Sequence, residues 1–436
     1  MNKIHYRKVI AFLSYINIEQ TAIATGFQKR IPKKITAANF LLSFFMTLSK
    51  KSYSLREWAT ELSILSGCSV SFQSIAKRLQ CRHLEFVKTM CILAIEDHFA
   101  KNIVFAHNAC FAFFNKVLIE DSTCIQLNKS LFEYYPGGRN QHKRSTIAKI
   151  QLSFDLKTHG VEHIGLSSYN KNDLTYASVI LDRIKPKDLI IRDLGYFVCK
   201  IFNQIIEKGA YFISRLSTIP LVYSQQDGTE LDMVKQLHKL DKRGIISYTQ
   251  EVQIGINDRV PARLIAVKLS KYETSKRRKA AGKRRTVSQK GYYLMSWSMF
   301  ITNVPISIMT DEQITKAYGL RWHIEIIFKN LKSNFGVHKI MNSSKGQNPI
   351  KPEILMYLSL LFMIMIYSKK LRDYHKIIYE KYERHLSPNK FAQFLCNHLL
   401  SVFETSEEVV RLLMQAKCCY DLRKDRMNTF EKLIYQ

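Results

Sequence analysis

Apolar residues change their spacing several times along this chain, and each change marks a different kind of structure. Over residues 1–105 they recur at helical intervals between Gly and Ser turns, which predicts a helical region. Three strand-like runs follow: VLIEDSTCIQL (117–127), IAKIQLSFDL (147–156) and VEHIGLSS (161–168). The Thr-His-Gly sequence at 158–160 predicts a hairpin turn between the last two runs.

The segment that follows predicts alternating helices and strands. A helix is expected at 172–184, and DLIIRDLGYF (188–197) has the shape of a buried strand that ends at Asp193. A second helix is expected from about 195 to 208, followed by a strand at 210–216. Together with the three earlier strands, this order predicts a mixed α/β core.

Residues 217–296 show a further change, to alternating strands with a strongly basic end. The segment 271–290 holds nine Lys and Arg residues against one Glu. Such a run is typical either of a disordered solvated loop or of a phosphate-binding arm, and in this chain we expect the arm. Residues 292–305 return as a strand, and from residue 350 onward the pattern is helical.

One long helix is predicted over residues 311–339. Thr310 and Asp311 can cap its start, and Gly336 can end it. At roughly 100° per residue, one arc of this helix is apolar and suits packing against a core. That arc contains Leu320, Ile324, Ile327, Phe328, Leu331 and Phe335.

A thin polar stripe runs beside the apolar arc. Four residues share an arc of roughly 60°: Tyr318, Arg321, Glu325 and Lys332. A carboxylate binds a hard cation, whereas Arg, Lys and Tyr donate hydrogen bonds to phosphate oxygens. An ordinary i,i+4 pair of Arg321 and Glu325 on a solvated face is the alternative. The complete set favours a metal ion held beside a phosphodiester.

Two aspartates complete a candidate site. Asp121 lies inside an apolar strand-like run, where an ionised side chain needs a reason. Asp193 ends a second apolar run, although an Asp at this position is often a helix cap. If both converge with Glu325 at one end of a sheet, the three carboxylates can hold two Mg²⁺ ions about 3.5–4 Å apart for phosphoryl transfer.

Composition points to a polyanionic partner. The 436 residues include 66 Lys and Arg against 36 Asp and Glu, a formal net charge of +30. Nucleic acid is the simplest partner for such an excess, and a membrane surface is the competing one. The longest apolar run, residues 354–367, is short for a bilayer span, so we expect a buried helix.

The cysteines and the start of the chain indicate a cytoplasmic protein. Nine cysteines are dispersed without zinc-ligand spacing, which suits free thiols in a reducing compartment and predicts no structural zinc. The basic N-terminal segment leads to no small-residue cleavage site, so no signal peptide is expected.

The candidate residues carry a family resemblance that covers roughly residues 110–340. The spacing Y-x2-R-x3-E-x6-K from Tyr318 to Lys332 resembles the helix signature of insertion-sequence-four-type DDE transposases. Asp121, in an Asp-Ser-Thr context, resembles the first aspartate of that family. Asp193, in an Asp-Leu-Gly-Tyr context, resembles the second.

The resemblance implies a domain organisation. A ribonuclease H-like α/β core with a mixed sheet is expected from residues 106–216 and 297–345, interrupted by a β-rich insertion at 217–296. Residues 1–105 would be a helical region, either a helix-turn-helix-like DNA binder or a plain basic bundle. Residues 346–436 would be a helical C-terminal region.

The resemblance also implies roles for single residues. Asp121, Asp193 and Glu325 would be the catalytic carboxylates that bind two Mg²⁺ ions, with Mn²⁺ as a substitute. The phosphate-binding residues beside the cut would be Tyr318, Arg321 and Lys332. Trp297 would match an aromatic that stacks on a flipped base in some relatives, with core packing as the alternative. Further DNA contacts are expected from the basic arm: Lys276, Arg277, Arg278, Lys279, Arg284 and Arg285.

The function expected from these observations is DNA transposition. The protein would bind the terminal inverted repeats of an insertion sequence, cleave double-stranded DNA at the element ends and join the 3′-hydroxyls to target DNA. A homodimer on DNA is implied because two ends must be paired, and no membrane is expected as a partner.

Three alternatives remain open at this point. A metal-dependent nuclease of the same fold would cleave without forming joined products. A transposase-derived DNA-binding protein without activity is disfavoured because Asp121, Asp193 and Glu325 are all intact. A peripheral membrane protein would use the charge and the apolar helix, but it leaves the three carboxylates unexplained.

Overall fold

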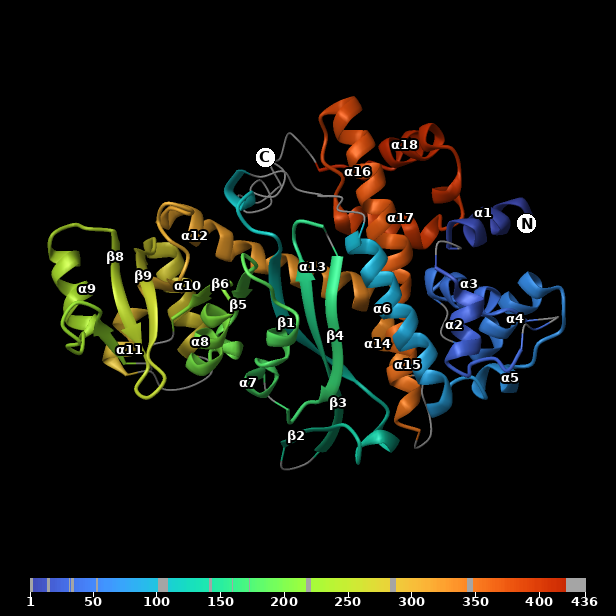
Figure 1. Cartoon of the computed structure of the whole chain (residues 1–436), viewed down its shortest axis with the longest axis horizontal. Helices are drawn as coiled ribbons and strands as arrows, with labels where there is room; N and C mark the ends of the chain where they lie inside the picture. The colour runs from blue at the N-terminus through green and yellow to red at the C-terminus, as the bar shows by residue number, and fades with distance from the viewer. Residues whose placement is uncertain are drawn as a thin grey trace.

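The fold is that of a computed structural model of the 436-residue chain. It describes residues 3–13, 16–30, 32, 35–51, 54–100, 109–140, 143–158, 160–171, 173–216, 221–282, 288–342 and 348–420. A mixed sheet crosses the molecule, and helices from the two ends of the chain gather on one side of it (Figure 1).

The N-terminal region is helical, as predicted. Its α-helices are α1 (Lys3–Leu13), α2 (Ile18–Ala24), α3 (Ala37–Ser49), α4 (Leu55–Ser66), α5 (Phe72–Ala76) and α6 (Leu84–Ala100). Ser and Thr side chains begin three of these helices by accepting backbone N–H groups: Thr36, Ser54 and Ser71. Helix α3 is buried along almost its whole length, and the Trp58 indole of α4 donates to the Ser43 hydroxyl at 2.9 Å. This region is therefore a packed bundle.

The C-terminal helices pack against the N-terminal ones. They are α14 (Val337–Asn342), α15 (Ile350–Phe362), α16 (Lys369–Tyr382), α17 (Pro388–Asn397) and α18 (Ser406–Gln415). Helix α15 lies beside α6 and α3, and the ring centroids of Phe45 and Phe362 are 5.6 Å apart. The two ends of the chain therefore build one helical body, seen on the right of Figure 1.

The apolar run at 354–367 forms a buried helix, as predicted. The helical stretch Ile350–Tyr382 has the length and composition of a membrane span, but 78% of its apolar window is buried inside the protein. A π-helical segment at Met363–Ser368 joins α15 to α16 within this stretch. Packing in the protein core accounts for the apolar residues of the whole stretch Ile350–Tyr382.

In the part of the chain that the structure describes, the sheet contains ten strands. They are β1 (Val117–Gln126), β2 (Pro136–Asn140), β3 (Lys143–Asp155), β4 (Gly160–Ser168), β5 (Leu189–Arg192), β6 (Tyr211–Arg215), β7 (Val222–Ser224), β8 (Ser247–Ile254), β9 (Val260–Lys268) and β10 (Trp297–Thr302). The order is β2-β3-β1-β5-β6-β10-β9-β8-β7, with β4 paired to β3. Strands β1, β5 and β6 are parallel and the other pairings are antiparallel, so the predicted mixed α/β core is confirmed.

Residues in the central strands alternate between two cores. Ile119 and Ile191 point into the core on the side of the helical body, whereas Leu118 and Ile190 point into a second core on the opposite face. Helix α8 (Cys199–Glu207) belongs to that second face. The alternation places Asp121 on the face of Ile119 and Glu120 on the face of Leu118.

The insertion continues the core sheet instead of forming a separate one. Strands β7, β8 and β9 extend it through β10, which pairs with β6 on one side and β9 on the other. Helices α9 (Met233–Lys242), α10 (Lys271–Gly282) and α11 (Gln289–Leu294) complete the insertion.

Two local predictions were wrong, and a third segment has a structure that the sequence did not indicate. The start of the basic segment, where a loop or a phosphate-binding arm was expected, forms α10 over residues 271–282 and buries Thr274. Residues 292–294 belong to α11, and the returning strand begins only at Trp297. The expected helix at 172–184 is broken into α7 (Asp173–Tyr176) and a 3₁₀ turn at Val179–Asp182, and the Ala177 carbonyl between them accepts a hydrogen bond from Arg192 at 2.6 Å.

Candidate active site

Asp121 lies where β1 emerges from the core. The first four residues of the strand are buried, and Asp121 to Thr123 are half-buried. Its Oδ1 accepts the backbone N–H of Ser122 at 2.8 Å, and its Oδ2 accepts Arg321 Nη1 at 2.8 Å. Burial raises the pKa of Asp121 to about 6; Ser122 and Arg321 oppose this shift, and the negative charges of Asp193 and Glu325 add to it.

Asp193 follows β5 directly, at the same end of the sheet. Glu120 and Arg192 are partners in the parallel register of β1 and β5, so Asp121 and Asp193 are the next residues along the two strands. The Tyr318 hydroxyl donates to Asp193 Oδ1 at 3.1 Å. A Cβ at Gly195 would lie 3.2 Å from Asp173 Oδ2, so a larger residue at this turn would press on the Asp173 side chain.

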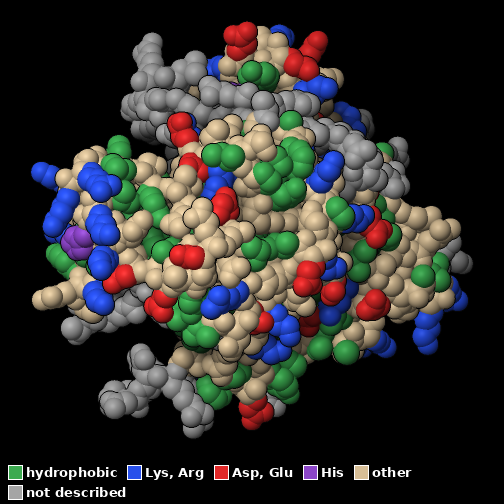
Figure 2. Space-filling view, turned by 60° about the vertical axis from the view of Figure 1, so that its left-hand side comes forward, with side chains coloured by type: hydrophobic (Ala, Val, Ile, Leu, Met, Phe, Trp, Pro, Cys, Tyr) green, Lys and Arg blue, Asp and Glu red, His purple; other side chains and the backbone are tan. Residues whose placement is uncertain are grey.

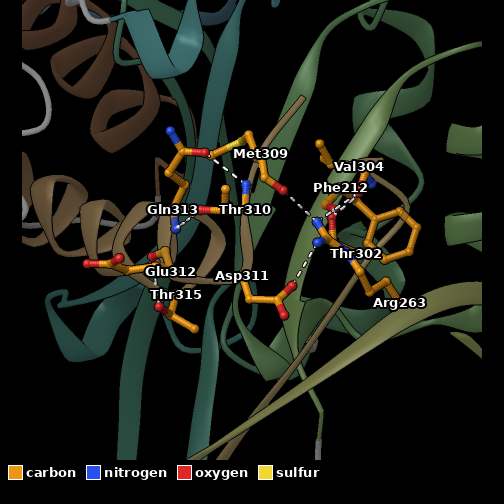
Figure 3. Close-up of polar contacts among 10 residues, drawn as sticks. All are labelled: Phe212, Arg263, Thr302, Val304, Met309, Thr310, Asp311, Glu312, Gln313 and Thr315. Carbon is orange, nitrogen blue, oxygen red and sulfur yellow. Dashed lines mark hydrogen bonds and ion pairs between the residues drawn. The ribbon is translucent and has the colours of Figure 1, made fainter. Parts of the chain in front are cut away.

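The helix that faces these aspartates starts at α12 (Asp311–Gly319). Thr310 and Gln313 form a reciprocal capping box, in which each side chain accepts the backbone N–H of the other residue. Arg263 of β9 donates to Asp311 at 2.7 Å and to the carbonyls of Val304 and Met309 (Figure 3). The insertion therefore fixes the start of this helix.

The prediction of one uniform α-helix over 311–339 was only partly correct. A 3₁₀ turn at Leu320–Trp322 separates α12 from α13 (His323–Lys329), and a π-helical segment follows at Asn330–Asn334. Gly336, at φ +63°, ends the run as predicted. The C-terminal helices hold the π segment: Asn330 donates to the Tyr367 hydroxyl at 3.1 Å, and Asn334 donates to Asn389 at 3.2 Å.

Arg321 is the centre of the site. From the 3₁₀ turn its Nη1 reaches Asp121, its Nε lies 3.8 Å from Asp193 Oδ1, and its Nη2 lies 3.6 Å from Glu325 Oε1. Burial lowers the pKa of Arg321, but Asp193, Tyr318, Asp121 and Glu325 outweigh it and raise the pKa above its ordinary value. The three predicted carboxylates thus gather around one guanidinium.

The three carboxylates have the chemistry of a site for a hard divalent cation. They provide only oxygen donors, and their side chains are 20%, 38% and 46% exposed, so solvent ions reach them. In the arrangement of this structure Arg321 lies among them, and no three His, Cys, Asp or Glu side chains of the described residues converge on one ion position. Metal binding would therefore require Arg321 to withdraw from Asp121.

Lys332 does not join this cluster. It lies in the π segment, and no ion pair connects it to a carboxylate among the described residues. Burial lowers its pKa, and its electrostatic neighbour is the Cys124 thiol of β1, three residues beyond Asp121. It flanks the site along β1.

Trp297 is buried in the insertion and is only 2% exposed. Its carbonyl accepts Arg277 Nη1 at 3.0 Å, and Arg277 Nη2 donates to Ser298 at 2.6 Å. Burial and the neighbouring Arg215 lower the pKa of Arg277 to about 10. Trp297 is therefore placed as a core residue, which is the alternative to a contact with a DNA base. Arg277 packs against the same strand through its hydrogen bonds to Trp297 and Ser298.

The outer side of α10 lines a basic pocket of about 600 Å³. Its charged and aromatic lining residues are Lys268, Lys271, Arg278, Lys279, Tyr292 and Tyr293. The Arg278 guanidinium lies 4.0 Å from the centre of the Tyr292 ring. Lys276 and Lys279 are exposed and form no ion pair with a described residue, whereas Arg284 and Arg285 lie outside the described residues. Figure 2 shows Lys and Arg side chains gathered toward the left, the side of the insertion.

Sequence reasoning missed Arg215 at the end of β6. The register pairs Arg192 with Ser214, so Arg215 follows beside Asp193 at the same edge of the sheet. The charge of Arg215 acts on both Tyr318 and Arg277, which places this cation between the carboxylates and α10. The available signal was a cation at the end of a buried strand, the same position that singled out Asp193.

Comparison with known proteins identifies the family to which this chain is similar. The family described as the transposase DDE domain matches residues 112–363, more than half of the chain. The chain is similar to the transposase for insertion sequence element IS231B of Bacillus thuringiensis subsp. berliner, with 28% identity over 91% of this chain and 87% of the relative. It is also similar to that for IS231C of the same organism, with 29% identity over 91% and 85%.

A relative from another genus gives the same result. The transposase for insertion sequence element IS1151 of Clostridium perfringens is 28% identical over 70% of this chain and 68% of the relative. The family match spans the segment from Asp121 to Glu325 that builds the site. This chain therefore belongs to the transposase DDE domain family, and within it to the insertion-sequence-four type.

Proposed function

We propose that this protein binds the terminal inverted repeats of an insertion sequence, cleaves DNA at the element ends and joins the freed 3′-hydroxyls to target DNA. The observation that carries this proposal is the gathering of Asp121, Asp193 and Glu325 around Arg321, from three separate elements. The relatives named as transposases support the same reaction class.

The three carboxylates are proposed to hold Mg²⁺, for which Mn²⁺ can substitute. Two bound ions would supply Lewis-acid activation of the attacking oxygen and charge stabilisation of the leaving oxygen. The crowding of three negative charges favours a divalent cation, because burial, with a smaller contribution from Asp193 and Glu325, already raises the pKa of Asp121.

The cations of the site are proposed to hold the DNA backbone. Arg321 carries a planar array of donors that suits the oxygens of a phosphate group, and its Nε makes no hydrogen bond to a described residue. Tyr318 and Lys332 flank it on the same run of helices, and Arg215 adds a positive charge at the sheet edge. These residues would align the scissile phosphate and stabilise its developing charge.

Farther from the reaction, the exposed side of α10 is proposed to contact flanking DNA. Lys276, Arg278 and Lys279 point from it toward solvent or into the basic pocket. The net charge of +30 supports an extended polyanionic partner. Pairing of two DNA ends by a homodimer, and residence with the bacterial nucleoid, follow from the proposed reaction.

The deciding experiment is a nicking assay on a labelled duplex that carries the element end, with Mg²⁺ or with EDTA. Wild type should nick only with Mg²⁺, and Glu325→Ala should lose nicking by at least about 10²-fold while retaining end binding. Glu312→Ala is a matched control, because Glu312 is an exposed carboxylate on the same run of helices. Equal nicking by wild type and Glu325→Ala would refute the assignment.

Joined products separate transposition from plain nuclease activity. A nuclease of the same fold would yield nicked DNA in this assay but no product linking the 3′-end to target DNA. A DNA-binding protein that has lost catalysis would bind the ends without Mg²⁺-dependent nicking, and the intact set of three carboxylates argues against it.

A further inference from the structure

A buried ion pair lies directly behind the two aspartates of the site. Glu120 precedes Asp121 in β1, and Arg192 precedes Asp193 at the end of β5. Arg192 Nε donates to Glu120 Oε2 at 2.6 Å, and the two side chains are 0% and 7% exposed, respectively. Because neighbouring strand residues point to opposite faces, this pair sits on the face of the sheet opposite Asp121.

Further contacts hold Arg192 in place. Its Nη2 donates to the Ala177 carbonyl at 2.6 Å, and its guanidinium lies 5.7 Å from the centre of the Tyr196 ring. The Tyr196 hydroxyl donates to Gln151 of β3, whose amide donates to Asp173 at 2.8 Å. Strands β1, β3 and β5 are thus tied together behind the site.

The apolar residues alone do not fix how β1 and β5 are aligned. Only four residue pairs join the two strands, from Val117 with Leu189 to Glu120 with Arg192. The first three pairs are aliphatic on both strands and buried on both faces, so a shifted alignment would bury similar groups. Among these four pairs, the charged one is satisfied only in this register.

Buried ion pairs are poorly suited to increasing stability, since apolar residues of the same size often serve as well. Their best-supported use is to select one register or arrangement. Here the selected register brings Asp121 and Asp193 side by side as the next residues of both strands. A change in the strand alignment would separate these two carboxylates.

We propose that the Glu120–Arg192 ion pair is a positioning device that holds Asp121 and Asp193 at the separation needed to share a divalent cation. This inference rests on the proposed function, because it assumes that the two aspartates bind metal. Neither Glu120 nor Arg192 is expected to touch DNA or the reacting atoms, since both lie on the opposite face of the sheet.

The test replaces the pair by apolar residues of similar size, Glu120→Leu with Arg192→Met. Mn²⁺ binding to the full chain is measured by electron paramagnetic resonance without DNA, and thermal unfolding is measured beside it. The double variant should bind Mn²⁺ about 10- to 100-fold more weakly, the range for residues that orient metal ligands.

The matched control is Lys116→Met with Glu162→Leu, which removes a 2.9 Å ion pair at the other end of β1. It should leave Mn²⁺ affinity within about twofold of wild type.

A milder variant covers the case in which the double variant does not fold. Arg192→Lys keeps the positive charge but loses the planar guanidinium that contacts both Glu120 and Ala177. It should weaken Mn²⁺ binding several-fold while it unfolds within a few degrees of the Lys116/Glu162 control. Wild-type Mn²⁺ affinity in a folded double variant, or in Arg192→Lys, would overturn the inference.

A second readout separates this inference from the proposed function. Hydrogen exchange of residues 189–196, measured without metal, should be several-fold faster in the double variant than in the control if the pair holds β5 in register. Failure of wild type itself to bind Mn²⁺ would count against the proposed metal site. The exchange measurement would then decide the positioning role, and unchanged exchange would reject it.

Discussion

At the scale of single residues, the site consists of three carboxylates around the positive charge of Arg321. Its guanidinium lies within 2.8 to 3.8 Å of oxygens from Asp121, Asp193 and Glu325. Burial and mutual repulsion raise the pKa of Asp121, and Arg321 opposes that shift. A divalent cation would neutralise the same carboxylates, so Arg321 and the cation are expected to compete for Asp121.

Arg321→Met should therefore make the metal-free protein less stable and more responsive to Mg²⁺. We expect a melting temperature about 2–4 °C lower without metal, equivalent to roughly 1 kcal/mol, because three carboxylates lose a shared counter-charge. Saturating Mg²⁺ should raise the melting temperature more in the variant than in wild type. Differential scanning fluorimetry measures both effects, with the exposed Arg411→Met as control. Equal Mg²⁺ responses in variant and wild type would contradict the competition.

His163 on β4 gives a pH prediction outside the metal site. Burial, with a smaller contribution from Arg183, lowers the pKa of His163 to about 4, and its Nε2 lies 2.6 Å from the Tyr176 hydroxyl. Because the unfolded chain protonates first, native stability from this group is complete above about pH 6.5 and is lost as the pH falls toward 4.

The loss should be on the order of 1–3 kcal/mol between pH 6.5 and pH 4. His163→Gln cannot bind a proton in this range, and its amide can still reach Tyr176. Urea unfolding at a series of pH values should therefore show a flatter profile for the variant. Parallel profiles for wild type and variant would show that His163 titrates normally in the folded protein.

At the scale of elements, the position of Tyr318, Arg321 and Glu325 depends on how their helix starts. The capping box of Thr310 and Gln313 stabilises the first turn. The contacts from Arg263 attach that turn to β9 of the insertion (Figure 3). The 3₁₀ turn that follows places Arg321 among the carboxylates.

Loss of the Thr310 cap and loss of the Arg263 contacts should lower the free energy of unfolding by different amounts. Thr310→Ala loses one cap and should cost about 1 kcal/mol of unfolding free energy. Arg263→Met leaves Asp311 and two carbonyls without their donor, and should cost about 3–5 kcal/mol. Urea denaturation gives both values, and nicking should fall more in Arg263→Met. A larger cost for Thr310→Ala would refute this ranking.

At the scale of the whole molecule, one continuous sheet carries both the catalytic core and the insertion. The basic surface of α10 is thereby held in a fixed position relative to Asp193, with Arg215 between them. Such an arrangement suits a DNA duplex that extends from the cut across the insertion. Its affinity should fall steeply with salt, because each phosphate contact releases counterions.

The double variant Lys276→Ala with Lys279→Ala should weaken binding of any duplex. It should also reduce the slope of log affinity against log salt by about two, one for each lost phosphate contact. Fluorescence polarisation across a salt series measures both. The exposed pair Lys376→Ala with Lys381→Ala on α16 serves as a charge-matched control. An unchanged slope in the α10 variant would remove this helix from the DNA surface.

Local patterns were sufficient to predict much of the fold. Alternating residues predicted β1, β3 and β4 within a few positions, and the caps at Thr310 and Gly336 were both correct. These features depend on neighbours in the chain, such as a side chain that accepts the N–H of the residue three positions on. The resemblance added the pairing of distant motifs, which the structure brings together around Arg321.

Features that depend on residues close together in the chain could be predicted from the sequence. They are the helical ends, the order of strands, the net charge and the three carboxylates with their contexts. Features that depend on distant partners became known only from the fold. The fold placed residues 271–282 in a helix and buried Trp297 behind Arg277. The fold also paired Glu120 with Arg192, which lie 72 positions apart in the sequence. The register between two strands depends on both of them, so neither segment alone shows a pattern that predicts it.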